Sequence, residues 1–199
     1  NNKGTEETRE RQIDYGVQFN TYLIKRFIEG KDITLFSPEL PGLYDSFFND
    51  QKKFAELYEK YEKDPLIKKK SIPSSKLFKQ FFNERASTGR IYYMITDLAN
   101  DYSPFDPVLN PITMSNLCCE ILLPTTSFEH EFDEAGRIQL CTLSNINWGA
   151  FSTPQEMEEV CYYVVRFLDN ILSLQEYPMI QAKLATEEFR PLGIGVNNL

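Results

Sequence analysis

The fold class is decided by the stretch Arg90-Ile91-Tyr92-Tyr93-Met94-Ile95-Thr96. Its β-branched and aromatic residues favour a strand, and its apolar character predicts that the strand is buried. Directly upstream, residues 74–84 predict an amphipathic helix with Ser74 or Ser75 as its N-cap, and Gly89 ends that region. A buried strand that follows such a helix is typical of α/β proteins.

Further upstream, the sequence predicts two more helices. Apolar residues recur at helical spacing from about Thr8 to Glu29, and Gly30 is a natural helix stop. Residues 50–63 show the same spacing, and Asp64-Pro65 closes that helix. Between the two helices, residues 34–38 predict an extended segment or loop.

Downstream of the deciding stretch, extended segments come first and a helix follows. Thr153, Pro154 and Glu156 form a capping box with proline at the first helical position, so a helix begins there. The other predicted segments are a loop over 100–111, an apolar extended run over 115–123, an acidic connection over 125–136, a strand over 137–147 and a short strand over 192–196.

Strands that alternate with helices favour an α/β protein with mostly parallel strands. The strand content is thin, so the segment is helix-rich and fits a portion of a sheet or barrel rather than a whole one. The first residue is Asn1 and not Met, so we expect a piece of a longer or split polypeptide. A length of 199 residues predicts a single domain.

Composition excludes several classes of protein. The chain is 42% hydrophobic and 14% aromatic, which argues against disorder. Its net charge of −8 is unfavourable for nonspecific nucleic-acid binding, which needs Lys and Arg. The sequence contains neither a membrane-length apolar run nor a basic-then-apolar signal segment. The four cysteines are therefore expected to be reduced thiols in the cytoplasm.

The candidate site lies in the run Ser115-Asn116-Leu117-Cys118-Cys119-Glu120. If the backbone is extended there, side chains alternate between faces, so Asn116, Cys118 and Glu120 share one face. Cys119 then points the other way, toward packed residues. An amide, a thiol and a carboxyl on one face suit chemistry on a hydroxyl-bearing substrate.

A neutral thiol fits this pattern better than a thiolate nucleophile. A neighbouring carboxylate disfavours a second anion. The only histidine, His130, lies in the polar connection and not beside Cys118. Chance alternation on an edge strand remains an alternative explanation of the pattern.

At these residues the sequence resembles the large catalytic subunit of class I ribonucleotide reductase. Segments along nearly the whole chain match that family's pattern in order. They are Asp14-Tyr15-Gly16-Val17-Gln18, residues 32–38, Pro41-Gly42-Leu43-Tyr44-Asp45, residues 84–92, Ser103-Pro104-Phe105-Asp106-Pro107, Ser115-Asn116-Leu117-Cys118, Leu140-Cys141-Thr142-Leu143-Ser144 and Leu192-Gly193-Ile194-Gly195-Val196.

The resemblance implies a fold, a reaction and site residues. The family folds as a ten-stranded α/β barrel with a central finger loop. Residues 1–199 would be part of that catalytic barrel domain, with the finger around residues 111–124. The family reduces ribonucleoside diphosphates by thiyl-radical chemistry. Cys118 would carry the thiyl radical, Glu120 would take the 3′-hydroxyl proton, and Asn116 would hydrogen-bond the sugar. The implied substrate-binding residues are Ser115, Asn116, Leu117, Cys118 and Glu120.

The resemblance also implies partners. Cys141 matches one member of the family's redox cysteine pair, whose partner lies outside this chain. A metal-containing small (beta) subunit would supply the radical, and thioredoxin or glutaredoxin would supply electrons. The rest of the catalytic subunit would complete a homodimeric enzyme. No metal or cofactor, nucleic acid or membrane is expected to bind this chain, and the chain alone is expected to be inactive.

Three other functions stay open at this stage. A class II adenosylcobalamin-dependent reductase shares the finger-loop chemistry. A metal site could draw on Cys118, Cys119, Cys141, Cys161 and His130, although their spacing matches no usual zinc pattern. An acidic helical interaction module needs no catalytic residue at all.

Overall fold

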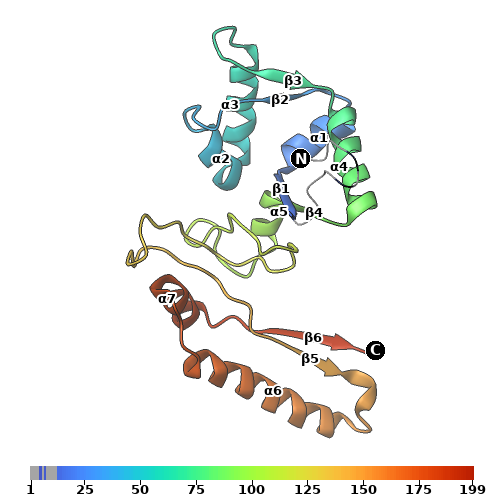
Figure 1. The fold of residues 1–199 in the computed structure, drawn as a ribbon, viewed down its shortest axis with the longest axis vertical. Coiled ribbons are helices and arrows are strands. Elements are labelled where there is room, and N and C mark those ends of the chain that lie inside the picture. Colours follow the sequence, from blue (N-terminus) through green and yellow to red (C-terminus); the bar gives the residue numbers. More distant parts are fainter. Residues whose placement is uncertain (1–4, 6, 8–12) are drawn as a thin grey trace. The chain divides into compact units, whose positions relative to one another are not determined.

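The computed structural model describes Thr5, Glu7 and residues 13–199 (Figure 1). The chain divides into two compact units, one ending at Leu123 and the other beginning at Pro124. Each unit contains a pair of parallel strands together with helices, which confirms the α/β class. Within the described residues the strands form separate two-stranded sheets, so this portion contains no closed barrel.

The parallel pair of the first unit joins β1 (Tyr15–Phe19) to β4 (Ile91–Ile95). Tyr15 lies opposite Ile91 and Phe19 opposite Ile95. The predicted strand at 90–96 is therefore confirmed. α4 (Ser74–Thr88) precedes β4 and extends beyond Glu84, where the predicted helix ended, but Gly89 ends the region as predicted. Its N-cap position is Pro73 without a side-chain cap, so the expected serine cap is wrong.

The helix predicted from Thr8 to Glu29 is wrong in its first half. The described part of that range begins with strand β1, and only α1 (Thr21–Ile28) is helical. Pairing with β4 stabilises residues 15–19 as a strand, although the spacing of their apolar residues favours a helix. The helix begins after Asn20, whose side chain accepts a hydrogen bond from the Leu23 amide at 3.0 Å. Gly30 stops it with a φ of 69°, as expected. Residues 8–12 lie outside the described residues.

A small antiparallel pair packs with two helices in the same unit. β2 (Ile33–Leu35) pairs with β3 (Lys70–Ile72). Between them in sequence lie α2 (Leu43–Asn49) and α3 (Gln51–Lys63). α3 confirms the helix predicted over 50–63, whereas α2 was not predicted. Leu43, Phe54 and Tyr58 are the buried centre of this region.

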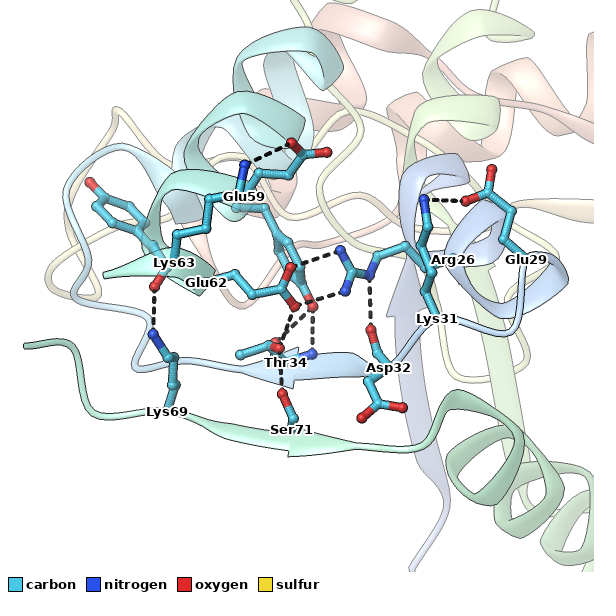
Figure 2. A network of polar contacts seen from close by, with 12 residues as sticks. Arg26, Glu29, Lys31, Asp32, Thr34, Glu59, Glu62, Lys63, Lys69 and Ser71 are labelled. Atoms are coloured by element: carbon cyan, nitrogen blue, oxygen red, sulfur yellow. Dashed lines mark hydrogen bonds and ion pairs between the residues drawn. The ribbon is translucent and has the colours of Figure 1, made fainter. Parts of the chain in front are cut away.

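A polar network ties α1, α3 and this antiparallel pair together (Figure 2). The Arg26 guanidinium forms an ion pair with Glu62 at 2.7 Å and donates from Nε to the Asp32 carbonyl at 2.9 Å. The Thr34 hydroxyl donates to the same Glu62 carboxylate at 2.6 Å. Tyr58 lies under the guanidinium, with its ring centroid 5.0 Å from Cζ. The buried charge of the Arg26 guanidinium is therefore compensated by a carboxylate, a carbonyl and an aromatic ring.

The first unit ends in irregular chain. α5 (Thr96–Asp101) follows β4 directly, so the loop predicted from residue 100 begins slightly later. Residues 111–123 contain no helix or strand, so the extended run predicted over 115–123 is wrong. A turn replaces it, for reasons given with the site below.

In the second unit, β5 (Leu143–Asn147) and β6 (Gly193–Asn197) pair in parallel, with a short 3-10 turn η1 (Trp148–Ala150) after β5. Two helices connect the strands, α6 (Pro154–Leu174) and α7 (Ile180–Phe189). β6 confirms the predicted final strand, whereas β5 covers only the end of the strand predicted over 137–147, and α7 was not predicted. The acidic connection is mostly exposed, and one isolated bridge joins Thr126 to Arg137.

The capping box of α6 is confirmed. The Thr153 hydroxyl accepts from the Glu156 amide at 3.3 Å. The Glu156 carboxylate accepts from the Ser152 amide at 2.9 Å, one residue earlier than in the usual box. Among the described residues, none of the helices combines the length and apolar character needed to cross a membrane.

Candidate functional site

The candidate site begins where the 111–124 segment leaves the body of the first unit. Ile112 is 1% exposed, and Asn100 bonds both of its backbone polar groups. The Asn100 side chain accepts from the Ile112 amide at 2.8 Å and donates to its carbonyl at 3.0 Å. Gln18 on β1 donates to the next carbonyl, that of Thr113, at 2.8 Å. These bonds fix the root of the segment to β1 and α5.

Beyond this root, the chain closes into a turn around Asn116. The Asn116 side-chain oxygen accepts from the Ile121 amide at 3.0 Å, and its carbonyl accepts from the Cys119 amide at 3.2 Å. Its amide group donates to the Glu120 carboxylate. Cys119 has a φ of 60°, which an extended strand does not allow. The side-chain bonds of Asn116 therefore override the β-propensity of the run.

This turn corrects the alternation argument made from the sequence. Asn116 and Glu120 are brought together by a hydrogen bond across the turn and not by sharing one face of a strand. Cys118 and Cys119 still differ as expected in exposure, because Cys118 is exposed and Cys119 is half-buried. The Cys119 sulfur lies 3.1 Å from the Ser115 hydroxyl.

The Cys118 thiol influences the pKa of Tyr92, which lies on β4. Cys118 raises the pKa of the Tyr92 phenol above its usual value. Arg85 of α4 covers the Tyr92 ring, with its Cζ 4.9 Å from the ring centroid. Asp14 and Arg85 also act on the Tyr92 pKa, the first raising it and the second lowering it.

A groove runs beside the turn. Its lining includes Gly16 and Gln18 of β1, Met94 of β4, and Ser115 and Asn116 of the turn. Leu117, which the resemblance also placed at the substrate, lines the same groove and is exposed. An amide, a hydroxyl and backbone groups thus line an open groove that can accept a polar ligand.

Cys141 lies in the second unit, two residues before β5, and is exposed. The carbonyl of the next residue, Thr142, accepts from the Gly193 amide at 2.9 Å, which holds this stretch against β6. Cys141 is a free thiol, like the other three cysteines. Its predicted place inside a strand is wrong because the β5–β6 ladder begins only at Leu143.

Metal-ligating side chains do not cluster in the part of the chain that the structure describes. Within Thr5, Glu7 and residues 13–199, no group of three or more His, Cys, Asp or Glu side chains is placed to hold a metal ion. The zinc alternative gains no support from these residues.

Sequence reasoning missed the residues that support the root of this segment, namely Gln18 and Asn100. Neither carried a usable signal, since each bonds to backbone groups far along the chain.

Comparison with known proteins gives a consistent result along the whole chain. A family model described as "Ribonucleotide reductase, barrel domain" matches residues 1–199. The chain is 50% identical over 199 residues to the ribonucleoside-diphosphate reductase subunit alpha of Haemophilus influenzae. It is 50% identical over 199 residues to the ribonucleoside-diphosphate reductase 1 subunit alpha of Escherichia coli, and 46% identical over 205 residues to the ribonucleoside-diphosphate reductase subunit alpha of phage T4. Each match covers 100% of this chain but only 26% of the relative.

Proposed function

The chain belongs to the ribonucleotide reductase barrel-domain family, and from that premise we propose that it forms the central part of a catalytic subunit that reduces ribonucleoside diphosphates. The observation that carries the proposal is the family match over residues 1–199. The Asn116–Glu120 hydrogen bond, in the turn that carries the exposed Cys118 thiol, supports it. The relatives' names specify a subunit alpha, which favours a class I enzyme over the adenosylcobalamin alternative.

In this proposal, the turn residues act on the ribose. The Cys118 thiyl radical takes the hydrogen atom from C3′, which forms an S–H bond and leaves the radical on C3′. Glu120 accepts the 3′-hydroxyl proton, and the Asn116 amide binds the sugar hydroxyls. Ser115 and Leu117 complete the contacts to substrate. The Asn116–Glu120 hydrogen bond supports these roles because it keeps the amide and the carboxylate within reach of one small ligand.

The finger loop corresponds to residues 111–124 in this proposal. Its root is bound by Asn100 and Gln18, and its tip presents Cys118 in an exposed turn. A residue that exchanges hydrogen atoms with a substrate must project from its support, and a turn achieves this. The surrounding barrel excludes water from the radical.

Cys141 is proposed as one thiol of the pair that supplies two electrons. Its partner cysteine lies elsewhere in the subunit. The two thiols give up two hydrogens as a disulfide forms, while the 2′-hydroxyl leaves as water and hydrogen replaces it. The exposed, unpaired state of Cys141 is compatible with this exchange. Thioredoxin or glutaredoxin then restores the thiols in the reducing cytoplasm.

The name subunit alpha implies a second subunit, and we assign the radical's origin to a metal-containing beta subunit. The catalytic subunit itself is proposed to be a homodimer. Both assignments concern the complete protein, of whose relatives this chain covers 26%.

The test is Cys118→Ser in the complete catalytic subunit, assayed with the small subunit and a thiol reductant. We expect deoxyribonucleotide formation to be lost while nucleoside-diphosphate binding persists, because serine keeps the size of the side chain but its O–H bond is too strong for the exchange. Cys161→Ser is the matched control, since Cys161 lies on α6 and should retain turnover. Turnover by Cys118→Ser would overturn the proposal.

A further inference from the structure

One face of β1 forms a wall of the groove beside the turn. Gly16 and Gln18 both line this groove, and because side chains alternate along a strand they lie on the same face. Met94 of β4 lies opposite Gln18 in the parallel pair and lines the groove as well. Ser115 and Asn116 of the turn add polar groups. With a volume of about 450 Å³, the groove is large enough for a small organic ligand.

The orientation of the Gln18 side-chain amide is fixed by its partners. Its nitrogen donates to the Thr113 carbonyl at 2.8 Å and lies 3.6 Å from the Met94 sulfur. A carbonyl oxygen can only accept, so the nitrogen of Gln18 and not its oxygen must face Thr113. Both N–H groups are then in use. Within the part of the chain that the structure describes, the Gln18 Oε1 has no hydrogen-bond partner, which leaves a free acceptor on a residue of the groove.

Gly16 leaves the β1 backbone uncovered beside this acceptor. A Cβ added at Gly16 would meet no atom within 4 Å beyond its chain neighbours, and the backbone there has no positive φ, so the described fold does not require glycine at this position. Glycine inside a strand weakens the strand and often marks a place where a ligand approaches the backbone closely. The groove therefore offers open space directly beside the Gln18 acceptor.

From this arrangement we propose that Gln18 is a further substrate-contacting residue, an assignment that rests on the function proposed above. Its Oε1 accepts a hydrogen bond from the 2′-hydroxyl of the ribose, which lies over β1 beside Gly16. In that function Glu120 takes the proton of the 3′-hydroxyl, so the 2′-hydroxyl is the remaining donor of the ribose. A hydroxyl both donates and accepts, so it can bond Gln18 while it accepts from the Asn116 amide.

This contact would distinguish the substrate from the product. A ribonucleotide carries the 2′-hydroxyl, and the deoxyribonucleotide lacks it. The test compares the affinities of cytidine diphosphate and 2′-deoxycytidine diphosphate for the complete catalytic subunit. We expect Gln18→Met to reduce the preference for the ribonucleotide about fivefold, because the methionine side chain has a similar length but no carbonyl acceptor. A preference within about 1.5-fold of the parent would overturn the inference.

Two variants separate the contact from other effects of the substitution. Gln80→Met, the same change at an exposed position on α4, should leave the preference unchanged. Asn100→Ala loosens the same root as Gln18→Met but removes no group that lines the groove, so it should change both affinities by the same factor. A preference that falls equally in Asn100→Ala and Gln18→Met would overturn the direct contact.

Gly16→Ala tests the placement of the ribose without altering Gln18. It adds one methyl group to open space in the groove and to no contact within the described fold. We expect the affinity for cytidine diphosphate to fall about fivefold or more, because the ligand would be displaced from β1. Unchanged affinity would overturn the placement of the ribose over β1.

These measurements are independent of turnover. Loss of the inferred contact would leave the proposed function intact, since the reaction does not depend on which residue binds the 2′-hydroxyl. Activity in Cys118→Ser would overturn the proposed function, and the ratio of the two affinities would still report whether Gln18 contacts that hydroxyl.

Discussion

The Asn100 side chain bonds the backbone of Ile112 in the way that a neighbouring strand would. Its amide group bonds both the N–H and the C=O of that residue, at 2.8 and 3.0 Å. A third bond, to the Thr96 carbonyl at 2.8 Å, fixes the Asn100 side chain to its own helix. The segment that carries Cys118 therefore starts from a rigid point although no sheet supports it.

Asn100→Ala is expected to loosen this root. It leaves two buried backbone groups without their partner, which costs about 1–3 kcal/mol for each group left unsatisfied. Hydrogen exchange in the complete subunit should show faster exchange over residues 111–124. Asn83→Ala, at an exposed position on α4, is the control and should leave exchange there unchanged. Equal protection in both variants would contradict the anchoring role.

Glu62→Ala is expected to destabilise the first unit strongly. It leaves the Arg26 guanidinium, whose side chain is 11% exposed, without its carboxylate and removes the acceptor of Thr34. Loss of one partner of a buried ion pair costs about 3–5 kcal/mol. The measurement is hydrogen exchange of the α1 and α3 amides.

The control for Glu62 lies on the same helix. Glu59 forms an exposed pair with Lys63 at 3.9 Å, so Glu59→Ala should cost less than about 1 kcal/mol. Similar losses for the two glutamate variants would show that the network contributes little beyond a surface pair.

Asp169 gives a pH-dependent prediction for the second unit. The Arg190 side chain donates from Nε to the Asp169 carboxylate at 2.7 Å and holds the pKa of that carboxyl below its usual 3.8. A lowered folded pKa means that this stabilisation is complete above pH 3.8 and is lost as the pH falls through the lower value.

The measurement is local hydrogen exchange around α7 in Asp169→Asn and in the parent protein, compared at equal pH. At neutral pH the variant should be less protected, and the difference should vanish in acid once the parent carboxyl is protonated. A difference that persists below the folded pKa would contradict this assignment. Lys183→Gln changes only the exposed pair with Glu187 and serves as the control.

The sequence predicted elements whose causes are local. β4 followed from its β-forming residues, α3 from its spacing and α6 from the Thr153 cap. The prediction was wrong where residues distant in sequence determine the backbone conformation. β1 is a strand because β4 lies beside it, and that partner is invisible in the local helical spacing.

In the candidate site, too, the sequence identified the residues but not the backbone conformation that they adopt. The resemblance identified the run from Ser115 to Glu120 from residue identity alone, but its shape could not be predicted from alternation. Asn116 bonds to Ile121 and Glu120 and bends the run into a turn. The Asn100 and Gln18 bonds join the root of this segment to elements far along the chain, so no pattern within the segment could predict them.

Both parallel strand pairs leave strand edges without a hydrogen-bonded neighbour among the described residues. Within the described residues each sheet has two strands, so each strand has only one hydrogen-bonded neighbour. The unpaired backbone N–H and C=O groups along such an edge can form hydrogen bonds with an additional strand. In an intact subunit, neighbouring strands of the same polypeptide can occupy them. A proteolytic product separated from those neighbours would offer the same sites to other molecules and would be prone to aggregate.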